Sequence, residues 1–185
     1  MSSALLAGLK VIELGQRISV PFCGKLLVGM GAQVVKVEPP QGDEARQMGP
    51  FPGDADHLEK SGLFLALNAN KYGVTLNLSE QRDFRLLRRL ASRADLLVAD
   101  GVLEGISGQI SVLDSLREGN PRLVVVSIAP FGSHGRYAEY KASDLVIAHM
   151  TGMAHTINSA VEDPDSDPPV RPGAYQIEYA VGLSA

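Results

Sequence analysis

An α/β fold with a doubly wound parallel sheet is predicted for this chain by three features of its sequence. Short runs rich in β-branched residues alternate with helical patterns over the first two thirds of the chain. Polar, glycine- and proline-containing segments follow the predicted strands. The 185 residues, 45% of them hydrophobic and 21% charged, are enough for one globular domain with a sizeable core.

The first strand, the first helix and the second strand follow one another at the start of the chain. The run LKVIEL (9–14) predicts a strand. The run PFCGKLLVGMGA (21–32) predicts a helix that Pro21 begins and that two glycines end. The run QVVKVE (33–38) predicts the second strand. This order is the start of a parallel βαβ unit.

A long polar segment follows at 39–62. It is rich in proline, glycine and acidic residues, so we expect a loop rather than part of the core. Long loops inside compact domains are more often functional than accidental. We therefore expect this segment to cover a ligand beside the end of the second strand.

The rest of the chain continues the alternation of strands and helices. Ser79 is expected to cap the amphipathic helix of this part. Two more helices are expected near 142–152 and 173–184, separated by an exposed loop at 158–173. Before them we expect a strand at 73–78, the amphipathic helix at 79–94, a strand at 95–100, a short helix at 111–120 and a strand at 122–128.

Composition and charge disfavour several classes of protein. The net charge is −4, and the basic residues are dispersed except at 85–93, where they alternate with leucines as on the outer face of an amphipathic helix. The single cysteine, Cys23, excludes an internal disulfide, and the four histidines form no local metal motif. No apolar run approaches ~20 residues, and the first residues lack the pattern of a signal peptide. We expect a cytoplasmic protein with no metal and with neither nucleic acid nor membrane as a partner.

A candidate cleft is expected at the carboxyl ends of the strands, where open α/β sheets bind ligands. Three segments follow predicted strands there: GQRISVP (15–21), EPPQGD (38–43) and IAPFG (128–132). The sequence contains neither a Walker loop nor the pattern GxGxxG. An ordinary nucleotide-binding site is therefore disfavoured.

One acid near the end of the chain needs an explanation, because a charge among apolar residues is costly unless it is paired or used. Glu178 is the only acid of the run PPVRPGAYQIEYAVGLSA (168–185). Helical spacing places it on one face with small residues, including Ala174 and Gly182. Small neighbours would let a backbone or a ligand approach the carboxylate. Periodicity alone nevertheless favours a solvated glutamate.

Five segments follow one another in a characteristic order: LAGLKVIELGQRISVPFCGKLLVGMGAQVVKVEPPQGDEAR (6–46), LNANKYGVTLNL (67–78), ADLLVAD (94–100), NPRLVVVSIAPFGSHGRYAEYKASDL (120–145) and PPVRPGAYQIEYAVGLSA (168–185). Their order resembles the opening of the family III CoA-transferases, the CaiB/BaiF group. The resemblance implies a Rossmann-like large domain, with residues 1–185 as an N-terminal CoA-binding domain. The second, small domain and the returning C-terminal segment of the family would be absent from this chain. It also implies an interlocked homodimer or a tandem-fused pseudo-dimer.

The same resemblance implies an acyl-CoA:carboxylate CoA-transferase, with a CoA thioester and an acceptor carboxylic acid as substrates and no metal. Glu178, four residues before Gly182, stands at the position of the family's nucleophilic aspartate. Its carboxylate would attack the thioester carbonyl to form a mixed anhydride. The residues implied in CoA binding are Gln16, Arg17, Ile18, Ser19, Arg46, Asn70, Lys71 and Asp100.

Departures from the family pattern leave alternatives open. Glu178 is one methylene longer than the family's aspartate, and Val20 stands where a glycine is frequent. Asp100 and Gly101 replace an Asn-Phe pair found in many members. The alternative function is a non-catalytic scaffold or CoA-binding unit of a longer or tandem CoA-transferase. An α-methylacyl-CoA racemase is less favoured, because Ser143 stands where racemases tend to carry a histidine.

Overall fold

Five parallel strands form a twisted sheet at the centre of the structure. The computed structural model describes residues 4–100, 109–132, 134–157, 163, 166–168, 170 and 172–185. The strands are β1 (Lys10–Leu14), β2 (Gln33–Glu38), β3 (Tyr72–Thr75), β4 (Leu96–Ala99) and β5 (Val124–Ser127). Their order in the sheet is β3-β2-β1-β4-β5, and every pairing is parallel. The direction of winding therefore changes between β1 and β4, as in a doubly wound fold.

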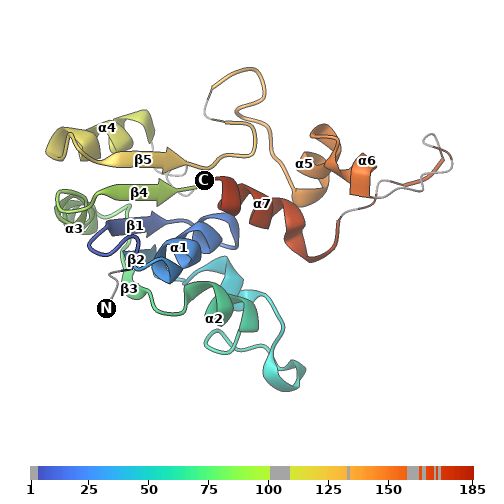
Figure 1. Cartoon of the computed structure of the whole chain (residues 1–185), viewed down its shortest axis with the longest axis horizontal. Coiled ribbons are helices and arrows are strands. Elements are labelled where there is room, and N and C mark those ends of the chain that lie inside the picture. Colours follow the sequence, from blue (N-terminus) through green and yellow to red (C-terminus); the bar gives the residue numbers. More distant parts are fainter. Residues whose placement is uncertain are drawn as a thin grey trace.

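Helices pack on both faces of this sheet, which confirms the predicted fold class (Figure 1). Successive strand side chains point to opposite faces. Val11 therefore packs with α1 (Ser19–Gly29), while Ile12 packs with α3 (Gln81–Ala91) and α4 (Gln109–Gly119). The core on the α1 face contains Val11, Val20, Cys23, Ala32, Val34 and Val98. The opposite core includes Ile12, Leu14, Val37, Leu87, Leu97, Leu116 and Leu123.

The C-terminal helices lie beyond the carboxyl ends of the strands. In Figure 1 the arrowheads of β1, β4 and β5 point toward α7 (Gln176–Ser184), and α5 (Asp144–Met150) and α6 (Met153–Ile157) lie farther out. Ile177 of α7 joins these two helices in a small separate core. The end of the chain thus returns to the edge of the sheet at which ligands are expected.

Several predicted boundaries differ from the structure, among them the start of α1, the cap of α3 and the end of β3. Helix α1 begins at Ser19 rather than Pro21, because proline is tolerated anywhere in the first turn, where the backbone N–H needs no partner within the helix. Ser79 does not cap α3; Glu80 is the N-cap residue, without a side-chain hydrogen bond. Strand β3 ends at Thr75 rather than at residue 78.

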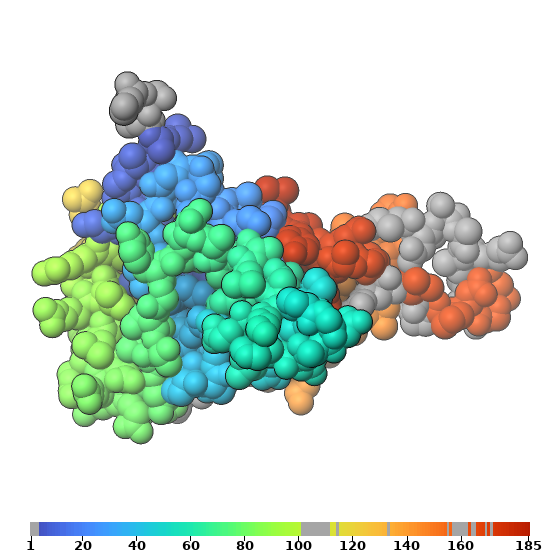
Figure 2. Space-filling view, turned by 90° about the horizontal axis from the view of Figure 1, so that it is seen from below, coloured from blue at the N-terminus to red at the C-terminus, as the bar shows by residue number. Residues whose placement is uncertain are grey.

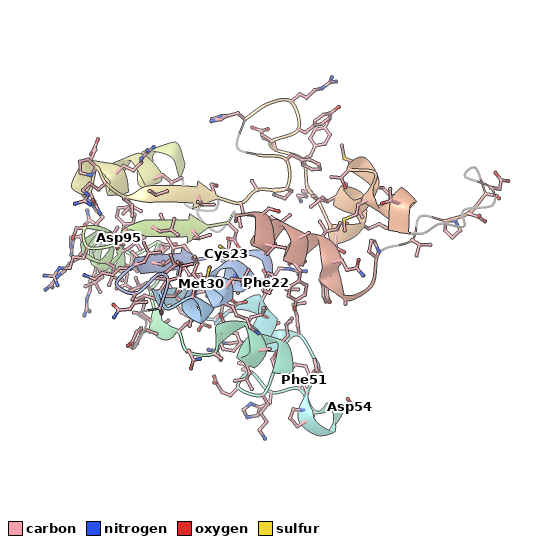
Figure 3. The ribbon with its side chains drawn as sticks, in the orientation of Figure 1. Phe22, Cys23, Met30, Phe51, Asp54 and Asp95 are labelled. Carbon is pink, nitrogen blue, oxygen red and sulfur yellow. The ribbon has the colours of Figure 1, made fainter. Side chains whose placement is uncertain are left out.

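Helix α2 (Gly62–Asn68) was not predicted. Ser61 caps it, because the Ser61 hydroxyl accepts a hydrogen bond from the Phe64 N–H at 3.1 Å. Phe64 and Leu67 bury one face of the helix. At seven residues it is too short for periodicity to reveal. In Figure 3, Phe51 and Asp54 mark the tip of the polar segment that precedes α2. This tip lies away from the sheet.

The predicted helix at 142–152 corresponds to α5, and α6, which was not predicted, follows it at 153–157. Gly152 separates them with a φ of +76°, a conformation that glycine adopts without a side-chain penalty. The η4 turn (Gly173–Tyr175) precedes α7, which begins at Gln176 rather than at residue 173. The loop predicted at 158–173 falls mostly outside the described residues, as does Gly101.

Candidate active site

A cleft of about 790 Å³ opens at the carboxyl ends of β1, β4 and β5. The segment after β1 supplies Gln16, Arg17 and Ser19 to its lining, Asp100 follows β4, and residues 128–130 follow β5. Helix α7 adds Glu178, and the start of α5 adds Ser143 and Asp144. The cleft thus lies at the topological switch point of the sheet, where two of the three predicted segments meet. The third, 38–43, lies mainly along a separate hollow of about 240 Å³, which shares Gln16 with the cleft.

Glu178 lies in the first turn of α7 and is largely covered. Its Oε1 accepts a hydrogen bond from Nη2 of Arg17 at 2.9 Å, and its side chain is 18% exposed. The expectation of a solvated glutamate from periodicity is therefore wrong, because pairing with Arg17 offsets the cost of covering the charge. Two consecutive residues, Ala174 and Tyr175, have φ near +57°, a conformation costly for side chains other than glycine. They turn the chain sharply into α7 just before the acid.

Gly182 fixes the distance between α7 and the start of α1. A Cβ atom at this position would overlap the carbonyl oxygen of Ser19. One turn earlier, the ring of Tyr179 packs edge-on against Phe22 of α1, with 4.9 Å between ring centroids. Figure 2 shows α7 (red) directly against the N-terminal third of the chain (blue). The small face predicted around Glu178 thus serves a close helix–helix approach, which brings the acid to the segment after β1.

We predict that Gly182→Ala will destabilise the protein by about 1–3 kcal/mol, the usual cost of overpacking. The added methyl group must push α7 away from Ser19, because the obstructing atom is backbone. Chemical denaturation of the complete polypeptide will measure the loss. Gly173→Ala is the matched control, since a Cβ there meets nothing within 4 Å. Equal stability of the two variants would contradict this account of the helix pair.

Arg17 is held at the cleft by its backbone as well as by Glu178. Its φ is +62°, and its N–H donates to Oδ1 of Asp43 at 2.9 Å. The preceding N–H, of Gln16, donates to Oδ2 of Asp100 at 2.7 Å. Nη1 of Arg17 lies 3.6 Å from a carboxylate oxygen of Glu44. The hydrogen bond to Glu178 is the main cause that raises the pKa of Arg17.

A buried chain of charges lies behind this segment. Nζ of Lys36 lies 2.7 Å from Oδ2 of Asp43 and 3.0 Å from Oε1 of Glu13, and it donates to the Gly15 carbonyl oxygen at 3.0 Å. These three side chains are at most 3% exposed. Burial alone would lower the pKa of Lys36, but the two carboxylates outweigh it and raise that pKa. Lys36 therefore fixes Asp43, which in turn fixes Arg17.

Lys71 completes the chain of charges rather than lining the cleft. Its ammonium donates to Oε2 of Glu13 at 2.7 Å, to the Pro21 carbonyl at 2.8 Å and to Oδ1 of Asn68 at 2.9 Å. Burial lowers the pKa of Lys71 to about 8 despite the pairing with Glu13. All three of its donors are occupied within the protein. A contact between Lys71 and CoA stays a prediction.

Arg46 also has protein partners for its charge. Its guanidinium makes two hydrogen bonds to Glu38, at 2.7 and 3.0 Å, pairs with Glu59 at 3.0 Å, and lies 3.7 Å from the ring centroid of Phe64. Burial alone would raise the pKa of Glu38, but the bonds from Arg46 contribute to lowering it. This pairing anchors the predicted ligand-covering segment to the end of β2.

The structure brings together five of the nine predicted site residues. Ile18 is fully buried, and Asn70 is exposed with a φ of +65°. Neither of them lines the cleft, and neither does Arg46 or Lys71. The five cleft residues are Gln16, Arg17, Ser19, Asp100 and Glu178.

Two acids of the cleft were missed or given another role by sequence reasoning. Glu44 lies in the η1 turn (Glu44–Gln47) and pairs with Arg17; no motif marked it. Asp144 is the first residue of α5, a position at which sequence alone favours no more than an acid that complements the helix dipole. It is 9% exposed, and among the described residues neither of its carboxylate oxygens has a hydrogen-bond partner. Ser143 caps α5, with its hydroxyl 3.4 Å from the Val146 N–H that donates to it.

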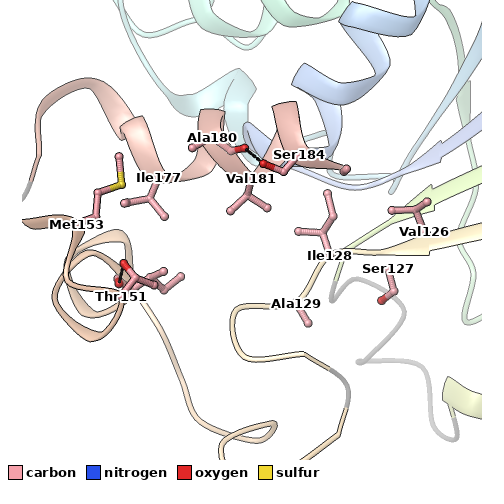
Figure 4. A pocket seen from close by; sticks show the side chains of 12 residues that line it. Val126, Ser127, Ile128, Ala129, Thr151, Met153, Ile177, Ala180, Val181 and Ser184 are labelled. Carbon is pink, nitrogen blue, oxygen red and sulfur yellow. Dashed lines mark hydrogen bonds between the residues drawn. The ribbon is translucent and has the colours of Figure 1, made fainter.

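An apolar groove of about 520 Å³ adjoins the cleft along α7 and shares Ile128, Ile177 and Val181 with it. Figure 4 shows Ile177 and Val181 of α7 pointing into it, opposite Ile128 beyond β5 and Met153 of α6. Within the described ranges, no helix is long and apolar enough to cross a membrane. In the same residues, no cluster of three or more His, Cys, Asp or Glu side chains could hold a metal ion.

Comparison with known proteins identifies a family over almost the whole chain. The model of CoA-transferase family III matches residues 6–185. The chain is 34% identical to the succinate–glutarate CoA-transferase of Agrobacterium fabrum over 88% of this chain and 40% of that protein. It is 35% identical to the formyl-CoA:oxalate CoA-transferase of Streptomyces coelicolor, over 99% of this chain and 42% of that protein.

A solved structure gives the same answer. A CaiB/BaiF family protein from Brucella suis matches with a TM-score of 0.80 and 31% identity, covering 96% of this chain and 46% of that one. The chain thus spans less than half the length of the relatives that it matches. The resemblance of the five ordered segments is confirmed by sequence and by fold, and the chain belongs to CoA-transferase family III.

Proposed function

We propose that this chain forms the CoA-binding part of an acyl-CoA:carboxylate CoA-transferase and supplies Glu178 as its nucleophile. The observation that carries the proposal is the placement of Glu178, a largely covered carboxylate in the cleft at the switch point of the sheet. The guanidinium of Arg17 and the N-terminal turn of α7 both lie beside this carboxylate. The CoA-transferase names of the relatives are consistent with this chemistry.

The proposed reaction needs no net proton transfer. A carboxylate oxygen of Glu178 bonds to the thioester carbonyl carbon, the C–S bond breaks, and the CoA thiolate leaves from a mixed anhydride. The thiolate then attacks the carbonyl carbon of Glu178, which releases the donor carboxylate and leaves a glutamyl-CoA thioester. An acceptor carboxylate attacks that thioester to form a second anhydride. The returning thiolate takes the acceptor's acyl group and restores the Glu178 carboxylate.

Substrate binding and assembly form part of the same proposal. Gln16, Arg17, Ser19 and Asp100 lie in the cleft with Glu178, which supports a role for them beside the thioester. Asn70, which is exposed, would contact CoA from a surrounding segment. Ile18, Arg46 and Lys71 would support CoA binding indirectly, by holding these segments in place. We propose that the complete protein adds a second domain and works as a homodimer or a tandem-fused pseudo-dimer. The open apolar groove beside α7 supports further protein packing there.

Trapping of the anhydride tests the proposal directly. The complete polypeptide is incubated with a single acyl-CoA and hydroxylamine, and its peptides are examined by mass spectrometry. We expect conversion of Glu178 to a hydroxamate that depends on the acyl-CoA, because hydroxylamine attacks an activated carboxyl group and not a free carboxylate. Free CoA and hydroxylamine together serve as the control. Unmodified Glu178 after turnover of the acyl-CoA would refute its role as nucleophile.

A non-catalytic unit is the second candidate, and one observation favours it. Glu178 is one methylene longer than the family's aspartate, and its Oε1 is engaged by Arg17. In that case this chain would supply a scaffold or CoA-binding surface to a separate active unit. Glu178→Ala would then leave turnover by the complete protein unchanged. If Glu178 is the nucleophile, the same substitution must abolish turnover.

A further inference from the structure

We infer that Arg17 binds the free carboxylate group of the departing donor acid and of the incoming acceptor while Glu178 is covalently occupied. This inference rests on the proposed function and assigns Arg17 to carboxylate recognition rather than to CoA. Arg17 is then a residue that changes partners during turnover, with Glu178 as its partner only in the resting state.

Arg17 is the residue of the cleft that can attract an anion. Among the described lining residues it is the one cation, and four acids line the same cleft: Glu44, Asp100, Asp144 and Glu178. A carboxylate that entered this cleft without contacting Arg17 would meet repulsion from several sides. The Arg17 side chain is 43% exposed, so a small acid can reach it.

Covalent chemistry at Glu178 releases the guanidinium at the stage when it is needed. In the anhydride and in the glutamyl thioester, Glu178 carries no negative charge, so its ion pair with Arg17 is lost. The remaining partner, Glu44, lies 3.6 Å away with a side chain that is 60% exposed, which makes a weak pair. The donor carboxylate is released, and the acceptor carboxylate is bound, in these neutral states of Glu178.

The backbone keeps Arg17 in place when its partner changes. The Arg17 N–H bond to Asp43 and the Gln16 N–H bond to Asp100 are independent of Glu178. Asp43 is buried and held by Lys36 at 2.7 Å. The guanidinium therefore stays within reach of the atom to which the acceptor must bond, and its planar fork suits a carboxylate.

Ligand binding without turnover tests this inference independently of the proposed function. Glu178→Gln is neutral and nearly isosteric, so it reproduces the charge of the occupied residue. With glutarate as the probe, calorimetric titration of the complete polypeptide should show at least tenfold tighter binding to Glu178→Gln than to the wild type. Adding Arg17→Gln to that variant should abolish the gain, whereas Arg82→Gln, at an exposed position of α3, should leave it unchanged. Equal affinity of the wild type and Glu178→Gln would overturn the inference.

Kinetics separate this role from a role in the first covalent step. In Arg17→Gln the KM for the acceptor acid should rise by about tenfold to a hundredfold, and Arg17→Lys should recover part of the loss. The yield of Glu178 hydroxamate from acyl-CoA without acceptor should change much less. Absence of hydroxamate in the wild type would refute the proposed function and leave the binding test standing. Loss of hydroxamate in Arg17→Gln, with an unchanged acceptor KM, would instead overturn the inference.

Discussion

Replacing Glu178 with glutamine is expected to lower kcat for CoA transfer by at least about a thousandfold, as is typical when a covalent nucleophile is removed. The amide keeps the size of the side chain but cannot attack a thioester. The variant should fold normally, because the amide oxygen can still accept a hydrogen bond from Arg17. Steady-state rates of the complete polypeptide will measure the effect. Glu118→Gln, at an exposed position of α4, is the matched control.

Glu178→Asp tests how far this site departs from the family pattern. The family's aspartate is one methylene shorter, but here the carboxylate meets Arg17 at 2.9 Å and α7 is seated by Gly182. A shift of about 1 Å can cost about a hundredfold in rate. We therefore expect Glu178→Asp to be slower than the wild type by about that factor and faster than Glu178→Gln. A faster aspartate variant would mean that the cleft still has the geometry of the family.

The sheet could be predicted from the sequence because its signal is local. Runs such as 33–38 and 95–100 are short, apolar and bounded by turn residues, and the structure has strands within both. Helix α2 was not predicted because it depends on tertiary contacts. Its Phe64 is covered in part by the Arg46 guanidinium, which approaches from the preceding segment. Some helix boundaries differ from the predicted ones at a cap residue or a glycine, as at Glu80 and Gly152.

The site was predictable in its position and less so in its partners. The ends of β1 and β5 could be assigned to one cleft, because ligands bind at the carboxyl ends of parallel strands. Asp100 and Glu178 were assigned to the site by the resemblance to the family. Sequence supplies the charge of Lys71 and Arg46 but not the buried acid that each one meets. The pairing of Arg17 with Glu178 joins residues 161 positions apart, so no local pattern could reveal it.

Replacing Lys36 with methionine is expected to destabilise the protein by about 3–5 kcal/mol, the usual cost of breaking a buried ion pair from one side. Methionine fills a similar volume, but it leaves Glu13 and Asp43 buried without their shared cation. The remaining partner of Glu13 is Lys71, while Oδ2 of Asp43 loses its contact with an ammonium group. Denaturant unfolding of the complete polypeptide will measure the change. Lys25→Met, the same exchange at an exposed position of α1, should cost little.

The loss of the Lys36 ammonium group should also alter the backbone beside the cleft. This effect distinguishes a role of Lys36 in positioning Arg17 from a role in global stability. Asp43 accepts the N–H bonds of Arg17 and Ala45, so an Asp43 that moves after losing its ammonium partner releases both segments. Hydrogen exchange should therefore accelerate at the Arg17 and Ala45 amides of Lys36→Met under conditions in which the protein stays folded. Exchange at the amides of α3, on the opposite face of the sheet, should change much less. Uniform acceleration in both regions would mean that Lys36 stabilises the whole domain without specifically holding Arg17 beside Glu178.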